Sequence, residues 1–394
     1  MAGREAFLLD PQIVYLNHGS YGACPRPVFE QYQAWQCELE REPVDFLTRR
    51  LAGLLAEARA ALAAYVNADP DHLVFVPNAT HAVNVIARSL DLRPGDEVLA
   101  TDLEYGACDL AWEYVCARAR ARYVRAPIPL PLARPSQVVD AVCERLGDRT
   151  RALFVSHVTS DTALVLPVEE LVRRARDAGV VTIIDGAHGP GQLPLDLPRL
   201  GADVYAGNCH KWLCAPKGSG FLHVRPELQQ SIDALVIGWG YGDGSTFVVR
   251  HEDQTTHDPA AYLSVPTAIE WVKENGTSER CRALTAEAQR WLIDLDGVEA
   301  LSTPDFLAQM VAVRVPTNDS AALEQRLRNH AIEVPVTARK TTPLLRVSIA
   351  PYNSRLDLDR LLEALPPLLR ADSERRTGRR PDSNRGRLQN GDLA

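Results

Sequence analysis

Residues 151–191 read "RALFVSHVTSDTALVLPVEELVRRARDAGVVTIIDGAHGPG" and contain one complete unit of the predicted fold. Two runs rich in β-branched and apolar residues, 151–158 and 181–185, flank a segment with the apolar spacing of an amphipathic helix, 167–179. A strand, a helix and a second strand in this order predict a βαβ unit with parallel strands.

The same alternation extends over most of the chain and indicates an α/β protein with a mainly parallel sheet. Ligands of such sheets collect at the carboxyl ends of the strands, so the residues that follow each run are the candidates for function. Further strands are expected at 72–77, 96–100, 121–126, 202–207 and 220–224, and further helices at 80–90 and 107–119.

The pattern changes near residue 260. A long polar helix is expected around 277–294, followed by the apolar runs "MVAVRVP" and "PLLRVSIA" with helices between and after them. This order indicates a smaller α+β domain over residues 260–370. The segment 371–394 is rich in Arg, Gly, Ser and Asn and has no aromatic residue, so we expect a disordered tail.

The composition excludes several classes of protein. The 394 residues carry a net charge of −8, which gives no electrostatic reason to expect a nucleic-acid partner. No window approaches the ~20 apolar residues of a membrane span, and the first residues lack the apolar core of a signal peptide. We therefore expect no membrane partner and a cytoplasmic location. Eight cysteines without a CxxC pair indicate reduced thiols.

The first candidate site lies where a strand meets a helix, in the stretch "FVPNATHAVNVIARSL" (75–90). The first turn of a helix has free backbone N–H groups, and the helix dipole favours an anion there. With the Thr80 hydroxyl, these groups could hold a phosphate. The alternative is that Asn78 or Thr80 only caps the helix.

Two further candidates follow later strands. Asp185 ends an uninterrupted apolar run, where a carboxylate is costly unless a cation or a strong donor meets it, so a ligand-binding or catalytic role is predicted. His188 could face the same ligand or lie on the surface. Lys211 ends another strand-like run and is one of four lysines in a chain otherwise supplied with arginines. A desolvated lysine can attack a carbonyl group, whereas the alternative is a surface lysine.

A zinc site is an alternative use of Cys209, His210 and Cys214. No second Cys/His pair follows at the spacing of a zinc finger, and neighbouring residues of an extended segment point to opposite faces. We therefore expect buried thiols and no metal site.

The phosphate site, the carboxylate and the lysine together match the needs of one cofactor, pyridoxal phosphate. The lysine bonds to the aldehyde of this cofactor. The carboxylate keeps its pyridine nitrogen protonated, so that the ring can accept electrons from the α-carbon of a substrate. The sequence therefore predicts a pyridoxal phosphate site at one edge of the sheet.

Motifs in order along the chain resemble those of the class V aminotransferase-like, fold-type I pyridoxal phosphate enzymes, and within them the isopenicillin N epimerase-like group. The resemblance covers nearly the whole chain before the tail. The motifs include "YLNHGSYGACPRPVFE" (15–30), "VFVPNATHAVN" (74–84), "IIDGAHGPGQLPLD" (183–196), "GNCHKWLCAPKGSGFL" (207–222) and "LLRVSIAPYN" (344–353).

The resemblance implies a fold-type I architecture, with a large domain around a mainly parallel seven-stranded sheet and a smaller α+β domain. It assigns residues 1–20 to a segment that lines the substrate entrance and 21–259 to the domain that binds the cofactor. It also implies a homodimer with shared active sites and a small-molecule amino-acid substrate.

Roles for individual residues follow from the same resemblance. Lys211 corresponds to the Schiff-base lysine, Asp185 to the partner of the pyridine nitrogen, and Tyr105 to the ring stacked on the cofactor. Arg346 corresponds to the arginine that grips the α-carboxylate of the substrate, and Thr256 to a residue that completes the phosphate site of the neighbouring subunit. Further cofactor contacts are implied for Asn78, Ala79, Thr80, Thr159, Ser160, His188, Asn208 and His210, and substrate contacts for Asn17, His18, Gly19 and His257.

Two residues depart from the epimerase pattern. His257 stands where the epimerases have Arg, and Asp161 stands where they have Pro. Both changes concern the substrate side of the pocket, so the substrate need not be that of an epimerase.

The resemblance ranks an epimerase of secondary metabolism, such as antibiotic biosynthesis, first. A carbon–sulfur β-lyase that acts on a cysteine S-conjugate or sulfoxide is the alternative, followed by a cysteine desulfurase or an aminotransferase. A desulfurase needs a reactive cysteine on a mobile loop, and no cysteine follows Cys281. A protein of this fold that binds without turnover is a further alternative, against which the retention of Lys211, Asp185 and Arg346 speaks.

Overall fold

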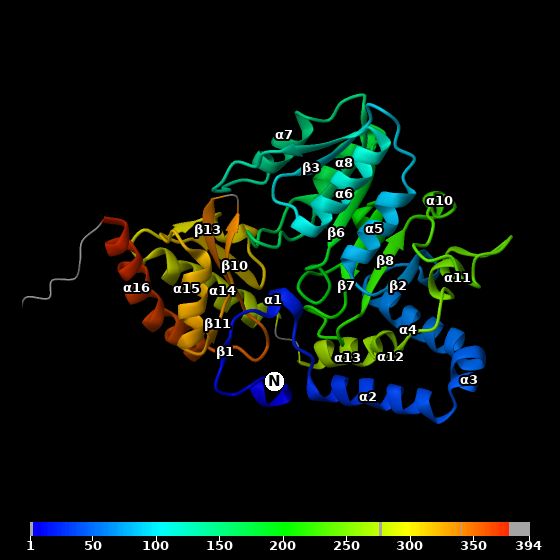
Figure 1. The fold of residues 1–394 in the computed structure, drawn as a ribbon, viewed down its shortest axis with the longest axis horizontal. Helices are drawn as coiled ribbons and strands as arrows, with labels where there is room; N and C mark the ends of the chain where they lie inside the picture. Colours follow the sequence, from blue (N-terminus) through cyan, green and yellow to red (C-terminus); the bar gives the residue numbers. More distant parts are fainter. Residues whose placement is uncertain (1–2, 276–277, 340, 378–394) are drawn as a thin grey trace, which may run out of the picture.

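A sheet of seven strands forms the centre of the larger domain in the computed structural model, which describes residues 3–275, 278–339 and 341–377 (Figure 1). Strand β8 runs antiparallel to both of its neighbours, and the other pairs are parallel. The α/β class and all seven expected strands are confirmed. In spatial order the strands are β2 (Leu73–Val76), β8 (Gly220–Val224), β7 (Val204–Asn208), β6 (Val181–Gly186), β5 (Thr150–Ser156), β3 (Glu97–Thr101) and β4 (Arg122–Ala126).

Helices cover both faces of this sheet, and the strands are therefore apolar on both faces. Alternate residues of one strand enter different cores: Leu73 and Phe75 join one cluster, whereas Val74 and Val76 join the other. The helices that precede the small domain are α1 (His18–Tyr21), α2 (Arg26–Arg41), α3 (Pro43–Asp45), α4 (Leu51–Tyr65), α5 (Ala79–Ser89), α6 (Gly106–Ala119), α7 (Ser136–Cys143), α8 (Val168–Asp177), α9 (Leu197–Leu200), α10 (Pro226–Gln229), α11 (Phe247–Glu252), α12 (Ala260–Leu263) and α13 (Val265–Asn275).

The smaller domain is built on an antiparallel sheet with its own apolar core. Its strands are, in order, β12 (Val336–Arg339), β13 (Thr342–Ser348), β10 (Met310–Arg314) and β9 (Glu299–Ala300), and its helices are α14 (Ser278–Ile293), α15 (Ser320–Asn329) and α16 (Arg355–Thr377). Strand β1 (Val14–Tyr15) pairs in parallel with β11 (Ile332–Glu333). The N-terminal segment therefore starts on the small domain and then leads to α2 beneath the large one (Figure 1).

Two domain limits differ from the sequence pattern. Helices α12 and α13, which the pattern assigned to the small domain from residue 260, pack against α2 and α4 and supply Leu263 and Ile269 to the core of the large domain. We propose that the small domain begins after α13. Helix α16 continues to Thr377, past the expected start of the tail at residue 371, and residues 378–394 lie outside the described part of the chain.

No helix in the described part of the chain is both long and apolar enough to cross a membrane.

Candidate active site

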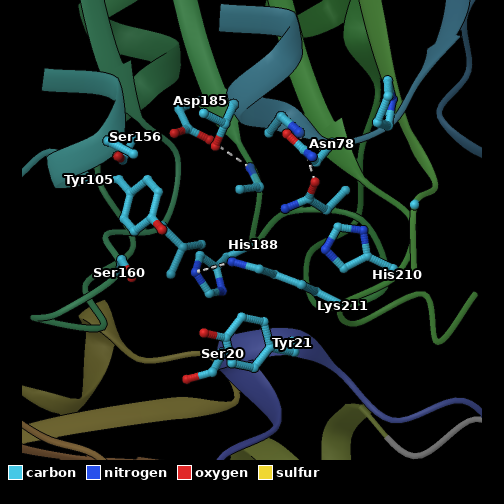
Figure 2. Close-up of a pocket in the computed structure, with 18 residues that line it drawn as sticks. Ser20, Tyr21, Asn78, Tyr105, Ser156, Ser160, Asp185, His188, His210 and Lys211 are labelled. Carbon is cyan, nitrogen blue, oxygen red and sulfur yellow. Dashed lines mark hydrogen bonds between the residues drawn. The ribbon is translucent and has the colours of Figure 1, made fainter. Parts of the chain in front are cut away.

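Residues that follow β2, β3, β5, β6 and β7 line a cavity of 480 Å³ at the carboxyl ends of these strands (Figure 2). Asp185, Lys211 and Tyr105 all reach this cavity. Ser20 and Tyr21 of α1 line it too, although they are far away in the sequence. The carboxyl edge of the sheet, where the sequence pattern predicted the site, therefore contains a cavity, and the N-terminal segment closes one side of it.

The amine of Lys211 lies 3.1 Å from Nε2 of His188 (Figure 2). Burial and the positive charge of Arg346 lower the pKa of Lys211 to about 8, although the negative charge of Asp185 acts in the opposite direction. A pKa of about 8 leaves about a tenth of the amine uncharged at pH 7, against about 0.03% for an unperturbed lysine. Lys211 is thus prepared to act as a nucleophile or a base.

Asp185 ends β6 with its carboxylate buried. One oxygen accepts a hydrogen bond from the Ala187 N–H at 2.9 Å, and the other lies 3.6 Å from the Cys108 thiol. Burial raises the pKa of Asp185, so its charged form is held only at a cost. A protonated ring nitrogen in the cavity would supply the cation that this carboxylate needs.

The end of the cavity beside the start of α5, here called the phosphate end, contains both features that the sequence left open, a helix cap and a candidate phosphate site. Asn78 caps α5, because its side chain accepts a hydrogen bond from the His81 N–H at 2.9 Å. The Ala79 N–H donates to Oδ1 of Asn208 at 2.8 Å. Thr80 also lines the cavity beside the start of α5. A helix N-terminus with a hydroxyl at its mouth fits a phosphate group.

His210 reaches the same end of the cavity from the β7 loop. Its Nδ1 lies 2.9 Å from the carbonyl oxygen of Ser219, so Nδ1 carries a proton and donates. Burial lowers the pKa of His210 to about 4. Gly218 lies nearby with φ of +87°, a conformation that favours glycine. The sequence interpretation did not include Gly218 in the site.

Arg346 of β13 brings a charge from the small domain to the edge of the cavity. Its guanidinium donates to the carbonyl oxygen of Ser160 at 2.8 Å, to Oγ of Ser20 at 2.9 Å and to Oδ1 of Asn17 at 3.4 Å. These partners are all neutral. Nε of Arg346 has no hydrogen-bond partner in the described part of the chain. A buried guanidinium without a carboxylate fits an anionic ligand.

The predicted N-terminal contacts divide between the cavity and the protein interior. His18 is fully buried, with Nδ1 3.0 Å from the Tyr352 hydroxyl and Nε2 2.9 Å from the Lys211 carbonyl oxygen. A Cβ on Gly19 would lie 2.7 Å from the sulfur of Met310. His18 therefore supports the loop of Lys211, Gly19 lies against the small domain, and the cavity is lined by Ser20 and Tyr21 in their place.

Thr159 is also used within the protein. Its hydroxyl lies 2.7 Å from that of Thr162 and accepts a hydrogen bond from the Leu164 N–H at 2.8 Å. This arrangement fixes the turn after β5, and Ser160 is the residue of the pair that lines the cavity.

Thr256 and His257 lie in the segment between α11 and α12, away from this cavity. Thr256 is exposed, and His257 lines a separate cavity of 190 Å³ beside Tyr262. Asp161 forms an ion pair with Arg339 across 3.6 Å, next to Ser160. Neither departure from the epimerase pattern therefore removes a group from the cavity itself.

Glu104 is a buried acid that the sequence interpretation missed. It accepts hydrogen bonds from the N–H and the hydroxyl of Ser156, at 2.8 and 2.5 Å, and burial raises its pKa to about 7. Its signal was its place directly before Tyr105 in "LEYGACDL", at the end of a strand. Ser156 lines the cavity, so Glu104 lies directly behind the wall of the site.

The thiols of Cys209 and Cys214 are buried, and burial raises the pKa of both. Among the residues that the structure describes, no group of three or more His, Cys, Asp or Glu side chains could hold a metal ion.

A desolvated lysine, a buried carboxylate and a helix N-terminus on one α/β sheet define a cofactor-dependent enzyme of the pyridoxal phosphate class. The aminotransferase class-V family matches residues 25–361, and the chain belongs to this family.

The chain is 38% identical to isopenicillin N epimerase of Streptomyces clavuligerus over 386 residues, which cover 93% of the chain and 97% of that protein. It is 40% identical to isopenicillin N epimerase of Amycolatopsis lactamdurans over 389 residues, with the same shares covered.

Solved structures of the enzyme C-DES are also similar at 25% identity. One, a mutant with glycine covalently linked to its pyridoxal phosphate cofactor, has a TM-score of 0.82 over 93% of this chain and 99% of that one. The other, a complex of this cystine C–S lyase with cysteine persulfide, has a TM-score of 0.81 over 90% of this chain and 98% of that one. The fold-type I architecture is thereby confirmed.

Proposed function

We propose that this pyridoxal phosphate enzyme removes the α-proton of an amino-acid substrate and that a proton exchangeable with the solvent is added on the opposite face, as in an epimerase of the isopenicillin N type. The observation that carries the proposal is that Lys211 and Asp185 line one cavity, while the Arg346 guanidinium, whose partners are neutral, contacts Ser160 and Ser20 at its edge. The similarity to two isopenicillin N epimerases supports the choice of reaction.

The cofactor, when bound, supplies a carbon that bonds to amines and a ring that accepts electrons. Lys211 is the residue that would hold the cofactor through this carbon, and its amine would be free once the substrate amine is bound there. The freed Lys211 amine then takes the α-proton, a step that its lowered pKa favours. The guanidinium of Arg346 would hold the carboxylate of the substrate. Asp185 would hold a proton on the ring nitrogen of the bound cofactor.

A carbon–sulfur β-lyase is the second candidate, because the chain is similar to a cystine C–S lyase over 90% of its length. Both reactions begin with the removal of the α-proton by the same residues. They differ in the second step, which is addition of a proton on the opposite face for the epimerase and loss of a β-substituent for the lyase.

The test separates the two reactions by their products. The purified enzyme is incubated in heavy water with isopenicillin N, and separately with cystine and cysteine S-conjugates. Inversion with deuterium incorporation and without pyruvate supports the epimerase. Pyruvate and ammonia support the lyase. If no substrate exchanges its α-proton, the proposal of an α-proton enzyme is wrong.

Substitution of Arg346 by Gln is expected to raise KM by about 10- to 100-fold with a smaller effect on kcat, because hydrogen bonds to charged groups contribute about 1.5–3 kcal/mol. The measurement is steady-state kinetics with the substrate found above. Arg314→Gln is the matched control, since Arg314 lies on the neighbouring strand and forms an ion pair with Glu299 away from the site. An unchanged KM in Arg346→Gln would show that the carboxylate binds elsewhere.

We also propose a homodimer in which Thr256 reaches the phosphate end of the other subunit's cavity. Thr256 is exposed and outside the cavity of its own chain. Trp239, in the preceding segment, is 95% exposed, and Ile237 is 62% exposed, as residues of an uncovered interface would be. Sedimentation measures the state. A monomer that binds the cofactor tightly would contradict the shared site.

A cytoplasmic location is part of the proposal. It is supported by eight cysteines that are all free thiols in the structure. Cell fractionation tests it, and recovery of the protein outside the cytoplasm would contradict it.

A further inference from the structure

Trp212 follows Lys211 directly in the chain. The side chains of the two residues are also linked, by hydrogen bonds to the ring of His188 that lies between them. The indole N–H of Trp212 donates to Nδ1 of His188 at 3.1 Å. The other ring nitrogen of His188, Nε2, lies 3.1 Å from Nζ of Lys211. Two loops, one after β6 and one after β7, thus form a row of three groups that ends at the amine (Figure 2 shows its last contact).

The direction of the hydrogen bonds in this row follows from the chemistry of its first member. An indole N–H can donate but cannot accept. Nδ1 of His188 therefore accepts and carries no proton, and the neutral ring carries its proton on Nε2. This N–H points to Lys211, so Nζ has to accept. An ammonium group has no lone pair, and the contact requires an uncharged amine.

We propose that Trp212 is a positioning residue: its indole N–H fixes His188 as the Nε2–H tautomer, and this tautomer stabilises the uncharged form of the Lys211 amine. The inference rests on the proposed function only in its last step, the use of the Lys211 amine as the base that removes the α-proton. It applies to the full chain freed of cofactor, where Lys211 is not covalently bonded.

The charges around the row favour this arrangement. Burial, together with the interactions of His188 with Lys211, Arg346, His18 and His210, holds the pKa of His188 well below its usual range. A second proton on His188 would also place an N–H against the N–H of Trp212. Lys211 faces Arg346, which disfavours its charge, and Asp185 and Cys108, which favour it. An N–H group of His188 that donates to Lys211 therefore adds to the interactions that favour the uncharged amine.

The position of Trp212 is fixed by its neighbours. Its indole packs on the ring of His18 with centroids 4.8 Å apart. The loop of His188 approaches the Trp212 backbone so closely that a Cβ on Gly191, which has φ of +83°, would lie 2.2 Å from the Trp212 carbonyl oxygen. The N–H of Trp212 therefore has little freedom to leave His188.

The test measures the titration of one amine. Cofactor-free full-length protein is labelled with trace acetic anhydride over a range of pH, and mass spectrometry follows the peptide that contains Lys211. In the wild type the midpoint is expected near pH 8. In Trp212→Phe it is expected to rise by about one unit, which makes Lys211 about tenfold less reactive at pH 7. Lys217, which donates to the Gly22 carbonyl oxygen, is the internal reference and should not move.

Trp112→Phe is the matched control variant. Trp112 is equally buried, and its indole N–H has no hydrogen-bond partner among the described residues. The same volume is lost without a hydrogen bond, so the Lys211 midpoint should stay at the wild-type value. If folded Trp212→Phe keeps that value too, the inference is wrong, whereas the cofactor can still bind Lys211 and the proposed function stands.

A second measurement needs no Trp variant. Nitrogen-15 spectra of the histidine-labelled wild type report which ring nitrogen of His188 carries the proton, with the signal assigned by its loss in His188→Asn. A protonated Nε2 and a bare Nδ1 are expected. A proton on Nδ1 would overturn the inference, because Trp212 could then not donate.

Discussion

Lys211→Ala is expected to lower the rate of α-proton exchange by at least about 10³-fold, because it removes both the covalent link to the cofactor and the base. Arg346, Asp185 and the phosphate end are left in place, so the cofactor is expected to bind without a covalent link. The measurement is deuterium exchange of the substrate, together with the visible absorption of the lysine-bound cofactor, which should be lost.

Two controls distinguish loss of the Lys211 amine from loss of its positive charge and from a general effect on the fold. Lys211→Arg keeps a positive charge but cannot bond to an aldehyde, and it should be as inactive as the alanine variant. Lys217→Ala removes a neighbouring partly buried lysine whose amine donates to the Gly22 carbonyl oxygen, and exchange should continue. If Lys211→Ala exchanges at the wild-type rate, another group is the base.

The sheet and its central site could be predicted because local patterns decide them. A strand that is buried on both faces has to be apolar along its length, and the first charged residue after it marks its carboxyl end. Asp185 and Lys211 satisfy this rule on the neighbouring strands β6 and β7. Parallel pairing then brings the two residues to the same edge, which requires no knowledge of side-chain contacts.

The N-terminal contribution could not be predicted at the level of single residues. The stretch 17–21 forms a single helical turn, and which of its side chains face the cavity depends on its docking to the small domain. His18 is a polar residue with partners 334 and 193 positions away in the chain. Nothing in the local sequence distinguishes such a buried structural histidine from a ligand-binding one.

The buried acid pair shows a second limit. Glu104 and Asp185 follow different strands, and the Coulombic repulsion of Asp185 contributes to the raised pKa of Glu104. Whether a carboxylate remains charged depends on the donors around it, here Thr101 and Ser156, and these meet only in the folded chain. The sequence identified Asp185 by its position, whereas the place of Glu104 before Tyr105 near the end of a strand does not show that the two acids lie close together.

Asp185→Asn is expected to lower turnover by about 10²- to 10³-fold, the size of effect that removal of one preorganised electrostatic group produces. The amide keeps an oxygen for the Ala187 N–H, so the end of β6 should hold its shape. The substitution removes the negative charge that holds a proton on the ring nitrogen. The variant should still bond the cofactor at Lys211, and kcat per bound cofactor is the quantity to measure.

The control for this variant is a second buried carboxylate on the same sheet. Asp203 accepts hydrogen bonds from the N–H and the hydroxyl of Thr182 and forms an ion pair with Arg225, outside the cavity. Asp203→Asn removes an equally buried charge and should reduce stability while kcat per bound cofactor stays near the wild-type value. If Asp185→Asn behaves in the same way, its carboxylate supports the fold and not the reaction. A fall in kcat confined to Asp185→Asn places the charge of this residue at the reacting ring.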